Sequence, residues 1–252
     1  MDNIVLLVLA ALLIVYAVSQ FAPGVVRRLL NVGAYRSSDL HSVVAPAAAP
    51  DVPAVSAVSS PLTTVAVRQE VRVLTLVSIA AAVLYYLPFW LHAPSFGGIP
   101  FQRQGMDRVY GMWDGPLWVT AAATLWDPNP HNPYYAWMGL RPSDYAERFP
   151  AFPLAIRLLS AVFGYWKGAL IINVAASTAV TLLLYTFLRR FGTAQPAEHP
   201  GARWSRAFWV ALVLIFWPPC GFLYRYVPMS EPLFILSVLA AAYFFKTRQY
   251  TL

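Results

Sequence analysis

Long runs of apolar residues alternate along the chain with polar stretches that contain many of its prolines and arginines. A helix rises about 1.5 Å per residue, so roughly 20 apolar residues cross the ~30 Å hydrocarbon core of a bilayer. The runs are continuous, a pattern that predicts helices rather than strands. We therefore expect an all-α polytopic membrane protein with about five transmembrane helices, at residues 4–18, 71–92, 168–188, 207–222 and 232–245. The second run ends in an aromatic cluster typical of a membrane interface: Tyr85, Tyr86, Phe89 and Trp90.

A shorter apolar run at residues 153–166 contains Arg157. The run after it ends at Arg189 and Arg190, and basic residues in such positions belong on the cytoplasmic side. If residues 168–188 run inward, residues 153–166 must begin and end outside. We therefore expect an interfacial or half-inserted helix, with a full crossing as the alternative. Arg157 then either snorkels to the headgroups or grips a lipid phosphate with its fork of donors.

The charges beside the runs also divide the chain into parts. Before the first run the only charged side chain is Asp2, whereas a signal peptide begins with positive charge, so we expect a retained helix. Repeated prolines in residues 37–66 oppose regular structure. The expected parts are an N-terminal anchor helix at 1–28, an Ala/Pro/Ser-rich cytoplasmic linker at 29–70, and a membrane domain at 71–252 with an extracytoplasmic loop at 93–152.

The composition agrees with this organisation. Hydrophobic residues make up 59% of the chain and charged residues 12%, where a soluble domain has about a quarter of its residues charged. The net charge of +7 comes from arginines beside the apolar runs, which meet anionic headgroups and do not indicate nucleic-acid binding. The single cysteine, Cys220, excludes an intrachain disulfide. The expected location is the inner (plasma) membrane of a bacterium, with the large loop outside the cytoplasm.

The stretch at residues 110–153 is rich in aromatic residues and also carries several carboxylates. Aromatic rings with a few carboxylates suit an amphipathic ligand, such as a sugar carried on a lipid. Asp114, which precedes Gly115 and Pro116, is either the N-cap of an amphipathic surface helix at 117–126 or a catalytic carboxylate. The two interpretations are compatible, because a carboxylate at a helix start can still reach a substrate.

A second carboxylate lies at the start of a later helix, in the pair Ser230-Glu231. Ser230 suits the N-cap position, and Glu231 suits the first turn, where the helix dipole favours negative charge. The alternative is a functional carboxylate beside Arg225, on the same side of the membrane as Asp114.

These residues together give the chain a resemblance to the PIG-V-like mannosyltransferases of the GT-C membrane glycosyltransferases, over residues 71–246. The family's loop motif Trp-Asp-Gly is matched by Trp113-Asp114-Gly115. A later Pro-flanked motif is matched by Phe149-Pro150-Ala151-Phe152-Pro153-Leu154, followed by Arg157. Residues 173–190 resemble a family helix with Asn near its start, here Asn173, and Met229-Ser230-Glu231 resembles a Tyr-Ser-Glu motif.

The chain also departs from the family. Met229 stands where the motif has tyrosine, and Ala151-Phe152 stands where the Pro-flanked motif has Leu-Tyr. The family has a core of about seven helices by this resemblance, whereas five or six are expected here. The interpretations left open are a fragment, one half of a split enzyme, and a descendant that kept the front half of the fold.

The resemblance implies a membrane glycosyltransferase, or its catalytic half. It would move a sugar, with mannose expected, from a polyprenyl-phosphate donor to a membrane-presented acceptor at the extracytoplasmic face. Asp114 would be the catalytic base and Glu231 would orient the acceptor. Substrate binding is expected at Trp113, Arg157, Arg225, Trp118 and Tyr110. No metal and no cofactor are expected, because the donor is already lipid-linked.

Two other functions are weighed against this one. The first is a non-catalytic membrane subunit on a GT-C-derived scaffold, which binds a second membrane protein that completes the helix bundle. The second is a small transporter or channel, which is less favoured because the expected helices lack the buried mid-membrane charges that such proteins usually need. The expected partners are a polyprenyl-phosphate sugar and membrane lipids, with a second membrane subunit as a further candidate and no nucleic acid.

Overall fold

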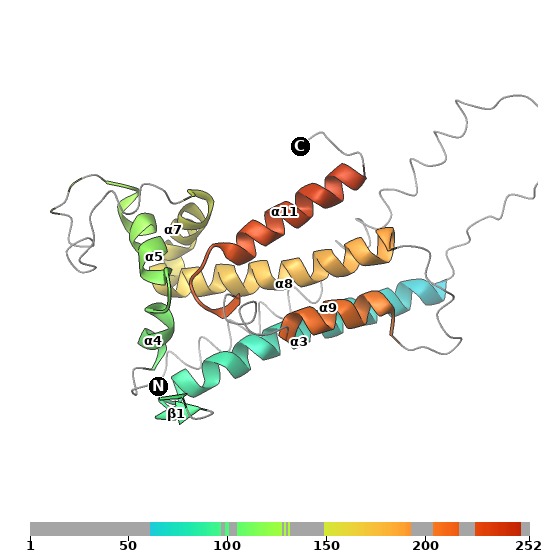
Figure 1. Cartoon of the computed structure of the whole chain (residues 1–252), viewed down its shortest axis with the longest axis horizontal. Coiled ribbons are helices and arrows are strands. Elements are labelled where there is room, and N and C mark those ends of the chain that lie inside the picture. Colours follow the sequence, from blue (N-terminus) through green and yellow to red (C-terminus); the bar gives the residue numbers. More distant parts are fainter. Residues whose placement is uncertain are drawn as a thin grey trace, which may run out of the picture. The chain divides into compact units, whose positions relative to one another are not determined.

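The computed structural model describes residues 61–96, 99–100, 105–127, 129, 131, 149–192, 204–216 and 225–247 (Figure 1). Helices dominate this part of the chain, as the apolar runs predict. The elements are α3 (Pro61–Trp90), β1 (Ser95–Phe96), β2 (Ile99–Pro100), α4 (Met106–Tyr110), α5 (Gly115–Thr124), α7 (Ala151–Phe163), α8 (Tyr165–Phe191), α9 (Arg206–Phe216) and α11 (Glu231–Lys246). β1 and β2 form a small antiparallel hairpin. The predicted anchor helix at 1–28 lies outside the described residues.

Two helices in the described ranges are long and apolar enough to cross a membrane. They are Val65–Trp90 within α3 and Tyr165–Phe191, which is α8. α7 and α9 are also apolar but shorter, at 13 and 11 residues. The two long helices support a membrane location for the chain.

α3 begins earlier than predicted, at Pro61, inside the stretch expected to be a linker at 29–70. Proline is tolerated in the first turn of a helix, because the N–H that it lacks would have no partner there. The next proline is Pro88, near the end of the helix. Helix α3 therefore includes the last ten residues of the stretch that was expected to be a linker.

The chain divides into two compact units. The first unit comprises Met1–Val77, Leu182–Val213 and Ala242–Leu252, and the second comprises Ser78–Thr181 and Leu214–Ala241. In the first unit the structure describes residues 61–77, 182–192, 204–213 and 242–247. The expected functional residues all lie in the second unit.

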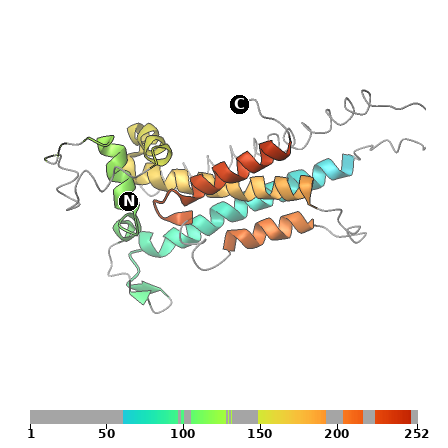
Figure 2. The same cartoon turned by 45° about the horizontal axis from the view of Figure 1, so that its top comes forward.

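A buried carboxylate connects three helices of the first unit. Glu70 of α3 is 2% exposed and accepts a hydrogen bond from the Tyr185 hydroxyl of α8 at 2.6 Å. It also accepts from the backbone N–H of Ser205 at 2.5 Å and from the Ser205 hydroxyl at 3.0 Å. Ser205 in turn caps α9, because its Oγ accepts from the N–H of Phe208. Figures 1 and 2 show α9 alongside α3, where this network forms.

Glu70 is a buried acid near the start of the apolar segment Val65–Trp90, just before the run predicted at 71–92, and it does not lie at the middle of the helix. A buried carboxylate is costly unless it is hydrogen-bonded, and here protein donors from α8 and from the start of α9 meet it. Glu70 therefore stabilises helix packing, and its presence does not favour the transporter interpretation.

We expect Glu70→Gln to lower the free energy of unfolding by about 1–2 kcal/mol, because hydrogen bonds to a charged acceptor are worth more than bonds to a neutral one. Thermal unfolding of the purified protein in detergent measures this change. Gln69→Ala, at the exposed neighbouring position, is the control and should leave the Tm nearly unchanged. An unaltered Tm for Glu70→Gln would contradict the stabilising role of the network.

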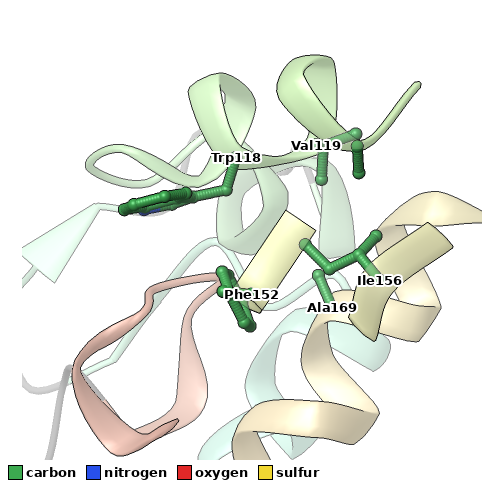
Figure 3. Packing of buried hydrophobic residues seen from close by; sticks show 6 residues of the cluster. Trp118, Val119, Phe152, Ile156 and Ala169 are labelled. Atoms are coloured by element: carbon green, nitrogen blue, oxygen red, sulfur yellow. The ribbon is translucent and has the colours of Figure 1, made fainter. Parts of the chain in front are cut away.

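The core of the second unit forms where α5 packs against α7 and the start of α8. Its buried members are Trp118, Val119, Ala122, Phe152, Ile156 and Ala169. Figure 3 shows Val119 facing Ile156, and Trp118 near Phe152 in an edge-to-face pair with ring centroids 5.8 Å apart. α5 is therefore not the amphipathic surface helix that was predicted. Its small residues, such as Ala121 and Ala122, are fully buried because they allow close packing.

α7 is apolar on two faces. Phe152 and Ile156 face the core, at 1% and 0% exposed. Leu154, Leu158 and Val162, spaced by one turn, are 49%, 79% and 77% exposed. Thirteen residues span about 20 Å as a helix, which is less than a bilayer's hydrocarbon core. The length of α7 and its row of exposed apolar residues therefore fit the predicted interfacial helix better than a full crossing.

Candidate functional site

The Trp-Asp-Gly motif forms the turn between α4 and α5. Trp113 has a positive φ of 54° and is 60% exposed. A non-glycine residue in this left-handed region costs of order 1 kcal/mol or more, so the surrounding structure must enforce the turn. The result is an indole displayed at the surface beside Asp114.

Asp114 occupies the N-cap position of α5, and its backbone carbonyl accepts from the N–H of Trp118 at 3.1 Å. Its side chain, however, makes no capping hydrogen bond to the first turn. The capping interpretation therefore holds for the position and fails for the carboxylate. The half-buried carboxylate is not used to start its own helix, which leaves the catalytic interpretation in place.

Gly115 is required by a close approach of two segments. A Cβ on this residue would lie 2.8 Å from the backbone oxygen of Tyr110 and 3.2 Å from both Cβ and Cγ of Pro228. Any side chain at position 115 would thus collide with the turn itself and with the segment that precedes α11. The motif glycine therefore marks the contact between the loop that carries Asp114 and the loop that leads to Glu231.

The segment before α11 is buried and fixed by two hydrogen bonds to its backbone. The Tyr86 hydroxyl of α3 donates to the carbonyl of Tyr226 at 2.8 Å, and the Asn173 side chain of α8 donates to the carbonyl of Val227. The rings of Tyr85 and Tyr226 stack with centroids 5.2 Å apart. The predicted interfacial belt is thus partly wrong, because Tyr86 is 5% exposed and packs inside the protein.

These contacts bring the two carboxylate-bearing helix starts to one region of the second unit. Asp114 is adjacent to Gly115, Gly115 packs against Pro228, and Glu231 follows three residues later as the first residue of α11. Glu231 is half-buried and lies in the first helical turn, where the dipole favours its charge. Two motifs more than a hundred residues apart in sequence thus lie in one region of the second unit.

Tyr110 is the last residue of α4 and directly precedes the turn. Its ring lies 5.5 Å from that of Trp166, centroid to centroid. Burial raises the pKa of the Tyr110 phenol, and the nearby carboxylate of Asp107 raises that pKa further. The phenol therefore stays protonated at neutral pH and can donate a hydrogen bond to a substrate oxygen, but it cannot act as the base.

Trp118, an expected substrate-binding residue, is placed differently. It is 6% exposed, and its ring packs on Phe152 in the α5–α7 core. The sequence could not distinguish a displayed indole from a buried one. Of the two tryptophans, only Trp113 is exposed. Trp118 therefore supports the site through the α5–α7 core and does not face a ligand.

Arg225 is also placed differently from the prediction of an external loop beside Glu231. It is 8% exposed and donates to the carbonyl of Ser177 at 2.8 Å, the hydroxyl of Thr181 at 2.6 Å and the carbonyl of Leu214 at 3.0 Å. Ser177 and Thr181 lie 12 and 16 residues into α8. Its hydrogen-bond partners in the described chain are neutral, so Arg225 fastens the segment before α11 to α8 and to the last turn of α9.

Arg157 caps the end of α5 from α7. Its Nη1 donates to the carbonyls of Ala122 and Ala123, both at 3.1 Å. These carbonyls belong to the last turn of α5, where a cation also complements the helix dipole. The side chain is otherwise exposed, so its remaining donors can still reach a phosphate.

Pro228 was given no role from the sequence, and the contacts that Tyr86 and Asn173 make in this region were not predicted. Tyr86 and Asn173 each hold a backbone carbonyl of the segment before α11. A polar side chain within an apolar helix must find a partner when it is buried, and this rule could have marked Asn173 in advance. In the ranges that the structure describes, no group of three or more His, Cys, Asp or Glu side chains could hold a metal ion.

No family model matches the chain, and no curated protein or solved structure matches it either.

Proposed function

We propose that the chain is a membrane glycosyltransferase, or the catalytic half of one, of the kind that the PIG-V-like resemblance implies. It transfers a sugar, with mannose expected, from a polyprenyl-phosphate donor to a membrane-presented hydroxyl at the extracytoplasmic face. The observation that carries this proposal is the contact of Gly115 with Pro228. That contact places the starts of α5 and α11, and so Asp114 and Glu231, in one region.

In the proposed reaction Asp114 is the base. Its carboxylate takes the proton of the acceptor hydroxyl while the hydroxyl oxygen attacks C1 of the sugar. The bond from C1 to the phosphate oxygen breaks, and polyprenyl phosphate leaves with the bonding electrons. One displacement of this kind inverts the configuration at C1. Glu231 orients the acceptor, and Tyr110 donates a hydrogen bond to a sugar or phosphate oxygen.

The donor is held by exposed side chains at the two ends of α5, Trp113 at its start and Arg157 at its end. Trp113 offers an indole face to the sugar. Arg157 offers the donors that are not bonded to α5, and an arginine fork suits a phosphate. Arg225, by contrast, is assigned to the support of the site, because its hydrogen bonds are made to α8 and α9. This assignment changes the expectation that Arg225 binds the phosphate.

The membrane placement follows the charge pattern. α3 and α8 cross the bilayer, and the runs at residues 207–222 and 232–245 supply two further crossings beside the one proposed at 4–18. The loop at 93–152 faces outward from the inner membrane of a bacterium, and the basic helix ends face the cytoplasm. α7 lies at the outer interface, with Leu154, Leu158 and Val162 toward the lipid.

A spin label at Leu158→Cys, in a Cys220→Ser background, should therefore be accessible to oxygen and lie about 5–10 Å below the headgroups. The matched control is Arg108→Cys, at an exposed position of α4 outside the apolar helices, where the label should report water. Power-saturation measurements in reconstituted vesicles separate the two environments. A water-exposed label at position 158 would contradict the interfacial placement of α7.

The transferase activity is tested with radiolabelled polyprenyl-phosphate mannose and the full chain in vesicles, alone and with any membrane protein that copurifies. We expect release of polyprenyl phosphate and transfer of the label to a lipid acceptor, with no transfer from a nucleotide sugar. If no transfer is seen with any copurifying protein, the chain is better explained as a non-catalytic subunit. The exposed apolar faces of α9 and α11 would then bind a second membrane protein.

A further inference from the structure

The first unit carries a one-sided charge. Its described residues include one acid, Glu70, and the basic residues Arg68, Arg72, Arg189, Arg190, Arg206 and Lys246. The described residues of the second unit are balanced, with the bases Arg108, Arg157, Lys167 and Arg225 and the acids Asp107, Asp114, Asp127 and Glu231. The excess positive charge of the described residues therefore belongs to the first unit.

Interhelical hydrogen bonds gather these cations. Arg68 and Arg72 flank Glu70 on α3, and Glu70 is bonded to Ser205, which directly precedes Arg206. Glu70 is also bonded to Tyr185, one helical turn before Arg189. The bond from Nη1 of Arg190 to the Tyr243 hydroxyl, at 2.6 Å, joins the end of α8 to the end of α11, one turn before Lys246. Four helices thus contribute residues to one basic cluster.

The cluster presents its charge outward. Arg68, Arg72, Arg206 and Lys246 are exposed, whereas the carboxylate of Glu70 is buried and hydrogen-bonded inside the unit. Arg190 is held in place by the rings of Phe191 and Tyr243, 5.3 and 5.5 Å from its guanidinium carbon.

Large apolar side chains are exposed among these cations. Val65 is 67% exposed, Trp209 51% and Phe245 70%, each within four residues of a basic residue. A surface that binds nucleic acid carries cations among polar residues. A surface that binds a lipid interface also needs apolar residues, because acyl chains lie beneath the anionic headgroups. Alternating cations and exposed apolar residues match the second of these partners.

We propose that this basic cluster binds anionic phospholipids of the leaflet that it faces, with the cations on the headgroup phosphates and the apolar residues among the upper acyl chains. The inference rests on the membrane placement in the proposed function, but it is independent of the transferase chemistry. It assigns to the first unit a lipid-binding surface separate from the sugar-transfer site of the second unit.

The test uses the full chain in vesicles of phosphatidylcholine alone or of equimolar phosphatidylcholine and phosphatidylglycerol. The fraction of a spin-labelled phosphatidylglycerol immobilised by the protein measures its relative affinity over labelled phosphatidylcholine. We expect Arg68→Gln/Arg72→Gln to reduce that preference roughly 30-fold, because each basic residue near an anionic surface strengthens the interaction about fivefold. Raised salt should reduce it as well, and soluble glycerol phosphate should not compete.

The matched control, Arg108→Gln/Lys167→Gln, removes the same charge from the second unit and should keep the preference. Arg206→Gln/Lys246→Gln is a second test variant, used if the first does not fold. An equal loss in the control, no preference in the wild type, competition by glycerol phosphate, or tighter binding of DNA than of lipid would each overturn the proposal. A chain that alkaline carbonate extracts from vesicles would instead refute the membrane placement.

Discussion

Replacing Asp114 with asparagine should lower the rate of sugar transfer about 100- to 10,000-fold, the usual contribution of a positioned general base. Asparagine has nearly the same shape as aspartate but cannot take a proton from the acceptor hydroxyl. Because asparagine keeps the size and shape of aspartate and the side chain does not cap α5, the loss of rate should be far larger than any change in the Tm of the protein. Initial rates with labelled polyprenyl-phosphate mannose, together with thermal unfolding of the same preparation, measure both effects.

The matched control for this prediction is Asp107→Asn. Asp107 is an exposed acid in the first turn of α4 and lies on the same loop. Its replacement removes an equal charge and should change the rate by less than a few-fold. Equal rates for wild type and Asp114→Asn would remove Asp114 as the base. A parallel loss of Tm would show that the residue acts in folding instead.

Gly115→Val is expected to destabilise the protein by about 3 kcal/mol, at the upper end of the usual cost of overpacking. The new Cβ would lie 2.8 Å from the carbonyl oxygen of Tyr110, a backbone atom that cannot move without opening the turn. The branch of valine would add to the contact with Pro228. Thermal unfolding in detergent reports the loss. Gly111→Val is the control, because the nearest atom to its Cβ is 3.3 Å away and the position is exposed.

The contact itself can be separated from the strain by a double-mutant cycle. Pro228→Gly removes both carbon atoms that the new Cβ meets at 3.2 Å. If Gly115 and Pro228 touch, the double variant should be more stable than the sum of the single changes predicts. Strict additivity would mean that the two segments do not pack together.

The helices could be predicted well because their signals are local. Long apolar runs bounded by arginines indicated α8, which ends close to Arg189 and Arg190, and the pair Ser230-Glu231 marked the start of α11 correctly. The charge pattern and length of residues 153–166 indicated a helix shorter than a crossing, as α7 is. For α8 and α11 the deciding residues lie within the element or directly beside it, and for α7 they include the arginines at the end of the following run.

Burial could not be predicted in the same way, because it depends on distant partners. Glu70 is hydrogen-bonded to Ser205, 135 residues away in sequence, and Arg225 to Ser177, 48 residues away. In the sequence, a charged residue near the end of an apolar run looks the same whether it is solvated by water or hydrogen-bonded to a neighbouring helix. The same limit explains why α5 was expected on the surface.

For the candidate site, the sequence indicated the two helix starts but not their meeting. Asp114 was placed correctly at the start of α5, yet only the structure could show that its side chain does not cap the helix. The contact between Gly115 and Pro228 depends on how α3 and α8 hold the segment before α11, through Tyr86 and Asn173. A polar residue within an apolar helix indicates that Asn173 needs a partner, but nothing in the local sequence identifies that partner or the one that Tyr86 finds.

Photolabelling with a polyprenyl-phosphate mannose that carries a photoreactive group on the sugar tests most directly whether these two segments form one lipid-linked sugar site. After irradiation in vesicles and proteolysis, the label should appear on peptides from residues 105–127 and 225–247, and excess unlabelled donor should remove it. Label confined to helix ends of the first unit, or label that unlabelled donor does not displace, would contradict the proposed site.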